Sequence, residues 1–193
     1  MMSAMPAMDP RAAGVLAFWF RASGRDARWF GKDPAFDAAV REGFLALHEK
    51  AAEGRLASWR DSRDDCLALI LLLDQFPRNM FRGSARAFAT DAPALEAARF
   101  AVAQGYDRRM RPVERLFVYL PFEHAESMEA QQRACELLAP LAAFPETEDV
   151  HRYALAHRDI IARFGRFPHR NAILGRASTA QEAEFLKQPG SGF

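Results

Sequence analysis

The chain has 193 residues, of which 50% are hydrophobic and 26% are charged, as expected for one folded domain. Its 26 basic and 25 acidic residues leave a net charge of +1, which argues against a general binder of nucleic acid or of membranes. The longest apolar run, 66–73, is far shorter than the roughly 20 residues of a membrane-spanning helix. Only two cysteines and no secretory signal favour a cytoplasmic location.

The composition also predicts the fold class. Alanine and leucine, the strongest helix formers, are abundant, whereas the β-branched residues typical of sheets are scarce. The sequence therefore predicts an all-α fold of seven or eight antiparallel helices with short connections. We expect a disordered tail over 1–8 and a single helical domain over 9–193.

The first half of the chain carries clear helix signals. Asp-Pro pairs at 9–10 and 33–34 predict two helix starts, with Asp as the N-cap and Pro in the first turn. The first of these helices is expected to break near 23–24. A third helix contains the run 67–73, which is apolar on every side and is therefore predicted to be central, and Pro77 is expected to end it.

The second half shows alternating helix starts and stops. Residues that start helices (Asp, Ser, Thr and Pro) and residues that end them (Gly and Pro) alternate along this half. They predict five more helices, over 91–105, 111–121, 127–141, 147–165 and 178–187. In the last two, Thr147 is the expected cap of one helix, and Ser178 with Gln181 reads as a capping box of the other.

Charge is unevenly distributed along this half. Residues 123–149 contain seven acids and one arginine, whereas 151–176 contain six arginines and one acid. One interpretation is that the two segments face each other and partly neutralise. The other is that the basic segment offers arginine forks to an anionic ligand.

Three polar segments sit beside apolar helices, at 74–79, 124–126 and 163–171. An Asp at a helix C-terminus, such as Asp74, is unfavourable unless a donor or cation offsets it, and Arg78 is one such partner. The arginines of the third segment can instead bond carbonyls at helix ends. The candidate ligand-binding residues are Asp74, Arg78, Asn79, His124, Arg163, Arg166, His169 and Arg170.

Acid–base chemistry is the alternative use of the same segments. His124 or His169 can act as the general acid or base, with Asp74 or Glu126 as its orienting carboxylate. His157 lies on an apolar stripe and is more typical of a satisfied core residue. No zinc, di-iron, serine-nucleophile or phosphate-loop motif occurs, so we expect neither a metal nor a cofactor.

Four stretches and the closing residues resemble one bacterial family, which is known only as domain of unknown function 924. The resemblance lies in Phe-Trp-Phe at 18–20, Leu-Asp-Gln-Phe-Pro-Arg-Asn-Met-Phe-Arg-Gly at 73–83, the 119–124 and 157–171 segments, and Gln-Pro-Gly-Ser-Gly-Phe at 188–193. It implies an all-α fold similar to degenerate tetratricopeptide repeats and no established activity.

Two functions follow as hypotheses. The first is a binding module whose polar pocket takes a small anion or a carboxylate-bearing chain end. The second is a metal-independent hydrolase or transferase acting on an anionic substrate. Partners are then a small anionic molecule or a peptide, with no nucleic acid or membrane, and the oligomeric state stays open.

Three segments that are distant in sequence, 74–82, 124–126 and 157–170, are expected to satisfy one another, because leaving ionisable groups half-buried and unpaired costs several kcal/mol. The sequence thus predicts that Asp74 or Glu126 contacts at least one of the arginines at 163, 166 and 170. It also predicts that the shared site opens to solvent on one side.

Overall fold

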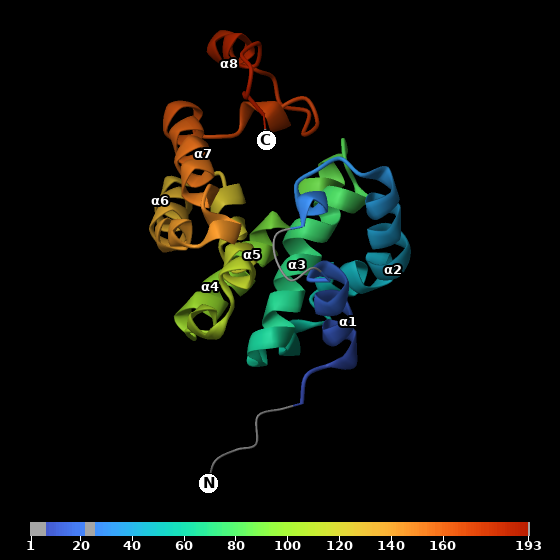
Figure 1. Ribbon diagram of the computed structural model, residues 1–193. Helices are drawn as coiled ribbons and strands as arrows, with labels where there is room; N and C mark the ends of the chain where they lie inside the picture. The colour runs from blue at the N-terminus through green and yellow to red at the C-terminus, as the bar shows by residue number, and fades with distance from the viewer. Residues whose placement is uncertain (1–6, 22–25, 193) are drawn as a thin grey trace.

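The computed structural model describes residues 7–21 and 26–192, which form helices and short 3-10 turns and contain no strand. The predicted all-α, single-domain fold is confirmed. The expected break at 23–24 and residues 1–6 of the expected tail lie outside the described residues. The α-helices of Figure 1 are α1 (Pro10–Trp19), α2 (Pro34–Ala52), α3 (Arg63–Met80), α4 (Asp91–Ala103), α5 (Pro112–His124), α6 (Met128–Leu138), α7 (Val150–Phe164) and α8 (Ala180–Phe185).

The two Asp-Pro starts are confirmed by their hydrogen bonds. Asp9 accepts from the backbone N–H of Arg11, and Asp33 accepts from those of Ala35 and Phe36. Each side chain satisfies backbone donors that the first turn of a helix leaves open, and the following Pro has no such donor.

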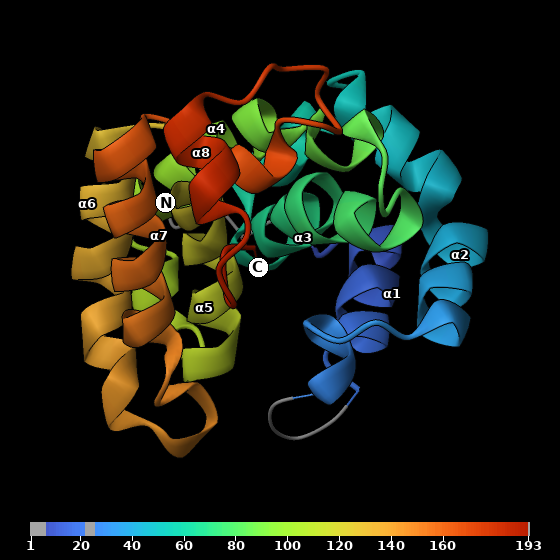
Figure 2. The ribbon, with the colours of Figure 1, turned by 90° about the horizontal axis from the view of Figure 1, so that it is seen from above.

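Helix α3 lies at the centre of the molecule, as its sequence predicts. It packs against α1 and α2 on one side and α4 and α5 on the other (Figure 2). All the residues of the 67–73 run are at most 3% exposed. A helix that is apolar on every side is stable only where neighbours cover all of its faces, so α3 organises the core.

Both expected stops at proline are wrong. Helix α3 continues through Pro77 to Met80, and α5 continues through Pro121 to His124. Proline removes the N–H that would bond the carbonyl four residues earlier. At Pro77 that carbonyl belongs to Leu73, and the hydroxyl of Thr90 donates to it instead over 2.5 Å.

Three helix boundaries in the second half also differ from expectation. The sixth helix ends at Leu138 and is followed by a 3-10 turn. Thr147 does not cap α7, because its hydroxyl donates to the carbonyl of Leu141. The capping box of α8 consists of Thr179 and Glu182, one residue later than predicted.

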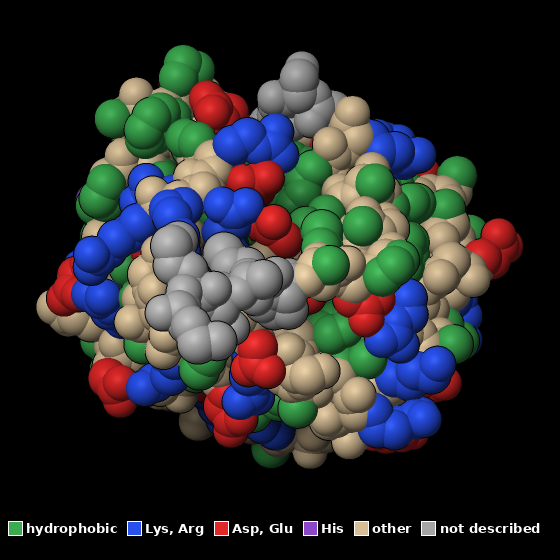
Figure 3. All heavy atoms as spheres, turned by 90° about the horizontal axis from the view of Figure 1, so that it is seen from below, with side chains coloured by type: hydrophobic (Ala, Val, Ile, Leu, Met, Phe, Trp, Pro, Cys, Tyr) green, Lys and Arg blue, Asp and Glu red, His purple; other side chains and the backbone are tan. Residues whose placement is uncertain are grey.

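Helices α4 to α7 pack in chain order, each against the next, and a 3-10 turn at Pro168–Arg170 leads from α7 toward α8 (Figure 2). Stacking as in tetratricopeptide repeats stays a prediction. No helix within 7–21 or 26–192 is long and apolar enough to cross a membrane. On the face shown in Figure 3, basic side chains lie among acidic ones.

Candidate functional site

The last two turns of α3 carry a buried carboxylate, Asp74, whose side chain is completely shielded from solvent. Its Oδ1 lies 2.7 Å from Nδ1 of His124, and its Oδ2 accepts from Nε2 of Gln75 over 2.6 Å. Arg78, one turn later, donates to the backbone carbonyl of Asp74 and lies 3.4 Å from Oδ1. Burial raises the pKa of Asp74, but the charge of Arg78 and the hydrogen bonds from His124 and Gln75 outweigh this and lower it. Asp74 is therefore ionised.

His124 is the last residue of α5 and faces Asp74 from there. Burial and the charge of Arg78 lower the pKa of His124 against the opposing effect of Asp74. The neutral ring donates Nδ1–H to the Asp74 carboxylate, so Nε2 carries the lone pair. This is the arrangement of a general base with its orienting carboxylate.

Asp91, the first residue of α4, joins two of the three polar segments. Its Oδ1 lies 2.9 Å from Nη1 of Arg78, and its Oδ2 lies 3.2 Å from Nη1 of Arg170. The α4 N-terminus favours a negative charge at this position. The 74–79 and 163–171 segments therefore meet at one place, as predicted. We call Asp74, Arg78, Asp91, His124 and Arg170 the arginine–carboxylate cluster.

Arg170 is the most enclosed cation of this cluster, with 6% of its surface exposed. Its guanidinium carbon lies 4.6 Å from the ring centre of Phe88 and 4.5 Å from that of Phe167. Burial and the charge of Arg78 lower the pKa of Arg170 to about 10, so it stays charged at neutral pH. Two buried donors in the cluster, Nε of Arg170 and Nη2 of Arg78, have no hydrogen-bond partner among the described residues.

A second buried pair lies next to the cluster. Burial and the nearby Asp74 raise the pKa of Glu123 to about 8, so this carboxyl is protonated at neutral pH. Its Oε1 is 3.4 Å from Nδ1 of His157, which donates to the carbonyl of Tyr153 over 2.9 Å. Burial lowers the pKa of His157 to about 3. His157 is thus the satisfied core residue that its position on the apolar stripe predicts.

Glu126 links the end of α5 to the segment that follows α7, and its use as an orienting carboxylate stays a prediction. It accepts from the backbone N–H of Phe167 over 2.7 Å and from both terminal nitrogens of Arg176. It thereby fixes the start of the Pro168–Arg170 turn to the end of α5. His169 packs its ring against that of Phe167, with 5.6 Å between the centroids, and burial lowers the pKa of His169 to about 4.

Four predicted ligand-binding residues are not part of the cluster, and His169, which packs on Phe167, is one of them. Asn79 donates to Asp37 over 2.7 Å, on another side of α3. Arg166 donates to Glu182 of α8 over 2.7 Å. Arg163 places its guanidinium over the ring of Phe164.

The predicted contact of Asp74 or Glu126 with the arginines at 163, 166 and 170 is wrong for the described residues. The ion-pair partners of the two acids are Arg78 and His124 for Asp74 and Arg176 for Glu126. The physical reason is that closer acids take up these arginines, as the pairs of Arg166 and Arg170 show.

Sequence reasoning misses three residues of the site. The local pattern marks Asp91 only as part of a helix start, although an acid in a first turn can also bind a cation. Glu123 and Arg176 lie beside candidate residues, but no local pattern indicates their partners, which are 34 or more positions away.

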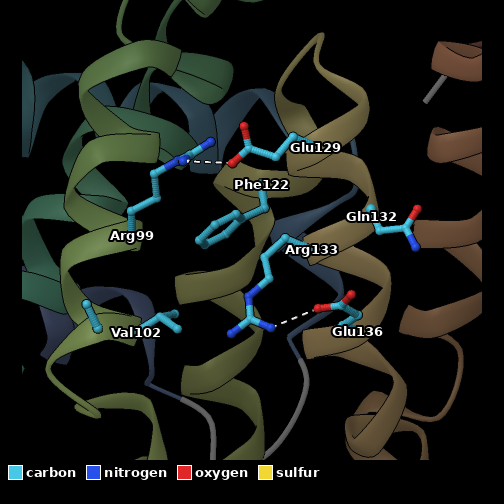
Figure 4. A pocket seen from close by; sticks show the side chains of 8 residues that line it. Arg99, Val102, Phe122, Glu129, Gln132, Arg133 and Glu136 are labelled. Carbon is cyan, nitrogen blue, oxygen red and sulfur yellow. Dashed lines mark hydrogen bonds and ion pairs between the residues drawn. The ribbon is translucent and has the colours of Figure 1, made fainter.

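Two grooves of the described residues lie outside the cluster. One of about 490 Å³ runs between α4, α5 and α6, with Phe122 in its wall. Ion pairs at its rim join Arg99 to Glu129 and Arg133 to Glu136 (Figure 4). Another lies around Trp59. In the described part of the chain, no three His, Cys, Asp or Glu residues are placed to hold a metal ion.

Comparisons with known proteins agree with the fold. The family model described as "bacterial protein of unknown function (DUF924)" matches residues 15–190. A solved structure of a protein of unknown function, ATU0120 from Agrobacterium tumefaciens, is 45% identical, with a TM-score of 0.86 over 93% of this chain and 98% of the other. No curated protein matches the sequence.

Proposed function

We propose that this chain, which belongs to the bacterial family of unknown function DUF924, binds a small carboxylate at the arginine–carboxylate cluster. One observation carries the proposal: Nη2 of Arg78 and Nε of Arg170 are buried donors without a hydrogen-bond partner among the described residues. Leaving such a donor unsatisfied costs about 1–3 kcal/mol, and more when the group is charged. A ligand acceptor would recover this free energy on binding.

The shape of the arginine fork supports a carboxylate in particular. Arg78 and Arg170 both use Nη1 for their ion pairs with Asp91. On Arg170, the unpartnered Nε belongs to the opposite edge of the guanidinium, whose two donors match the two oxygens of a carboxylate. The rings of Phe88 and Phe167 hold the plane of this guanidinium.

The charges of the cluster make the affinity for a carboxylate depend on pH. Asp74 and Asp91 already balance Arg78 and Arg170, so a bound anion adds a negative charge that a proton can offset. His124 is the neutral base of the cluster, with 14% of its side chain exposed, and its lowered pKa rises when an anion binds. The affinity should therefore increase as the pH falls.

The test is titration calorimetry with acetate, succinate and inorganic phosphate. We expect a carboxylate to bind the wild-type protein and to bind at least tenfold more weakly to Arg170→Gln and Arg78→Lys, since Lys keeps the charge but loses the fork. Arg166→Gln is the matched control, because Arg166 lies in the same segment but pairs with Glu182. The proposal is wrong if neither carboxylate binds, or if the control loses as much affinity as Arg170→Gln.

A second candidate function is acid–base catalysis on such a ligand. The supporting observation is the Asp74–His124 pair, in which Asp74 Oδ1 lies 2.7 Å from Nδ1 and Gln75 fixes the other carboxylate oxygen. A hydrolase or transferase acting on a carboxylate-bearing substrate fits this pair. Its test is turnover of carboxylate-bearing esters and amides: loss of turnover with retained binding in His124→Gln supports it, and unchanged turnover contradicts it.

A further inference from the structure

The arginine–carboxylate cluster contains an unsatisfied acceptor as well as unsatisfied donors. Oδ1 of Asp91 is buried and has no hydrogen-bond partner among the described residues, like Nη2 of Arg78 and Nε of Arg170. This oxygen lies 2.9 Å from Nη1 of Arg78, which is close enough for an ion pair, but the two groups lack the alignment of a hydrogen bond. A ligand that carries only acceptors cannot satisfy it.

The unsatisfied donor of Arg78 and the unsatisfied acceptor of Asp91 are neighbours. Nη1 of Arg78, the atom that Asp91 approaches, belongs to the same guanidinium as the unpartnered Nη2. A ligand that serves both groups must therefore carry its donor and its acceptor close together. An α-amino acid does so, because a single carbon atom separates its ammonium from its carboxylate.

The charges of the cluster also favour a ligand of this kind. The ion pairs of Asp74 and Asp91 with the two arginines leave the cluster without a net charge. A simple carboxylate adds an uncompensated negative charge to partly buried groups, which is costly. The ammonium of an α-amino acid brings the compensating positive charge with the ligand itself, so the balance of the cluster is kept.

His124 gives the cluster a second acceptor. Its Nδ1 lies 2.7 Å from Oδ1 of Asp74, so the neutral ring keeps a lone pair on Nε2. The same carboxylate oxygen lies 3.4 Å from Nη1 of Arg78, which makes His124 and Arg78 immediate neighbours. The side chains of His124, Arg78 and Asp91 are 14–19% exposed, so a small ligand can reach them from solvent.

We infer that the ligand of the cluster is a free α-amino acid, whose carboxylate accepts from the unpartnered arginine donors and whose ammonium donates to Asp91. This inference rests on the proposed function, because it names the chemical class of the ligand at that same site. It accounts for both kinds of unsatisfied buried atom in the cluster, whereas a simple carboxylate accounts only for the donors.

The experiment compares matched ligands by titration calorimetry at neutral pH. Glycine is paired with acetate and aspartate with succinate, because the members of each pair differ only by the ammonium group. A fifth ligand, γ-aminobutyrate, carries both groups but separates them by three carbon atoms. The proteins are the wild type, Asp91→Asn and, as the matched control on the same helix, Glu96→Gln, whose side chain is 69% exposed. Circular dichroism checks that each variant is folded.

We expect each amino acid to bind the wild type and Glu96→Gln about tenfold more tightly than its partner, because the ammonium adds a charged hydrogen bond. Glycine should exceed γ-aminobutyrate by a similar factor. In Asp91→Asn the preference within each pair should fall to about threefold or less, since an amide oxygen attracts an ammonium less than a carboxylate does.

Equal affinities within both pairs in the wild type overturn the amino-acid ligand and leave the carboxylate site standing. An undiminished preference in folded Asp91→Asn, or γ-aminobutyrate binding as tightly as glycine, also overturns it. If Asp91→Asn does not fold, the ligand series on the wild type decides alone. If none of the five ligands binds, both the amino-acid ligand and the carboxylate site are wrong.

Discussion

At the scale of single residues, Asp91 holds the site together, because it is the carboxylate that pairs with both arginines of the cluster. It pairs with Arg78 over 2.9 Å and with Arg170 over 3.2 Å, and only 19% of its side chain is exposed. Two guanidinium groups that leave water need a counter-charge nearby. Removing that charge leaves both of them buried and less well compensated.

Asp91→Asn should therefore lower the free energy of unfolding by about 3 kcal/mol. Urea denaturation measures this value. The control is Glu96→Gln on the same helix, whose pair with Arg60 is weak because 69% of the Glu96 side chain is exposed. We expect a loss below about 1 kcal/mol there. Equal losses in the two variants would show that Asp91 is no more than a surface partner.

Glu123 makes the stability of the protein depend on pH, in a pH range that is separate from that of the histidines. Burial and Asp74 raise its pKa from 4.5 to about 8, so the folded state holds an extra proton between these values and stability falls as the pH rises through them. His157 and His169, with pKa values of about 3 and 4, act in the opposite direction but only below their usual 6.5. Above pH 6.5 the effect of Glu123 stands apart from theirs.

Glu123→Gln should remove this decline, because Gln resembles the protonated carboxyl and does not titrate. Between pH 6.5 and 8 the wild type should lose roughly 1–2 kcal/mol more stability than the variant. Chemical denaturation at a series of pH values measures the difference. Parallel curves for the two proteins over this range would mean that Glu123 is already ionised in the fold.

At the scale of elements, Pro77 shows how a neighbouring helix start can rescue an interrupted helix. The proline leaves the Leu73 carbonyl without its usual partner, and the Thr90 hydroxyl supplies one. Because α3 continues, Asp74 and Arg78 stand one turn apart on a helix, and both face the cluster. The connection between α3 and α4 thus completes the hydrogen bonding of α3 itself.

Thr90→Val should cost about 1–2 kcal/mol of unfolding free energy, because it leaves a buried carbonyl without a donor. The same substitution in a Pro77→Ala background should cost less, since an alanine at this position restores the backbone N–H. A double-mutant cycle measured by thermal or urea unfolding gives this coupling. Additive effects would mean that Thr90 and Pro77 act independently.

Whether an element can be predicted from the sequence depends on how far apart in the sequence its interacting residues lie. Local sequence is enough to predict two helix starts, from the caps Asp9 and Asp33. It is also enough to predict the central helix, because the apolar surface of the run 67–73 must be covered. The extension past Pro77 depends on a hydroxyl 17 positions away from the carbonyl that it bonds, which no local signal contains. The same holds for the site: Arg78 and Asp74 are near neighbours, whereas Arg170 meets Asp91 across 79 positions.

At the scale of the whole molecule, α8 is a minor unit attached to the main core. Ile160, Ile161 and Phe167 form a separate small apolar cluster, and Phe164 and Phe185 pack against it. The main polar link is Glu182, which binds Arg166 and keeps a pKa of about 2 through that pairing. A unit held by so few contacts opens without unfolding of the rest.

Glu182→Gln should therefore increase amide hydrogen exchange across 176–192 by roughly tenfold and leave α3 unchanged, because the charged hydrogen bonds from Arg166 to Glu182 are weakened. Hydrogen exchange with mass spectrometry resolves the two regions. Glu184→Gln on the same helix is the control, since Glu184 pairs with Lys187 just beyond α8 and both side chains are about 70% exposed, so the pair contributes little. Faster exchange in α3 as well would show that α8 and the core unfold together.

The central position of α3 has a consequence for the chain during its synthesis. Its apolar surface needs partners on both sides, yet α4 and α5 follow it in the sequence and end roughly 50 residues later. At translation rates of about 5–20 residues per second, several seconds pass between the synthesis of the run 67–73 and that of the end of α5. During that interval the run presents the kind of exposed apolar segment that chaperones bind, so the nascent protein should depend on them more than its small size suggests.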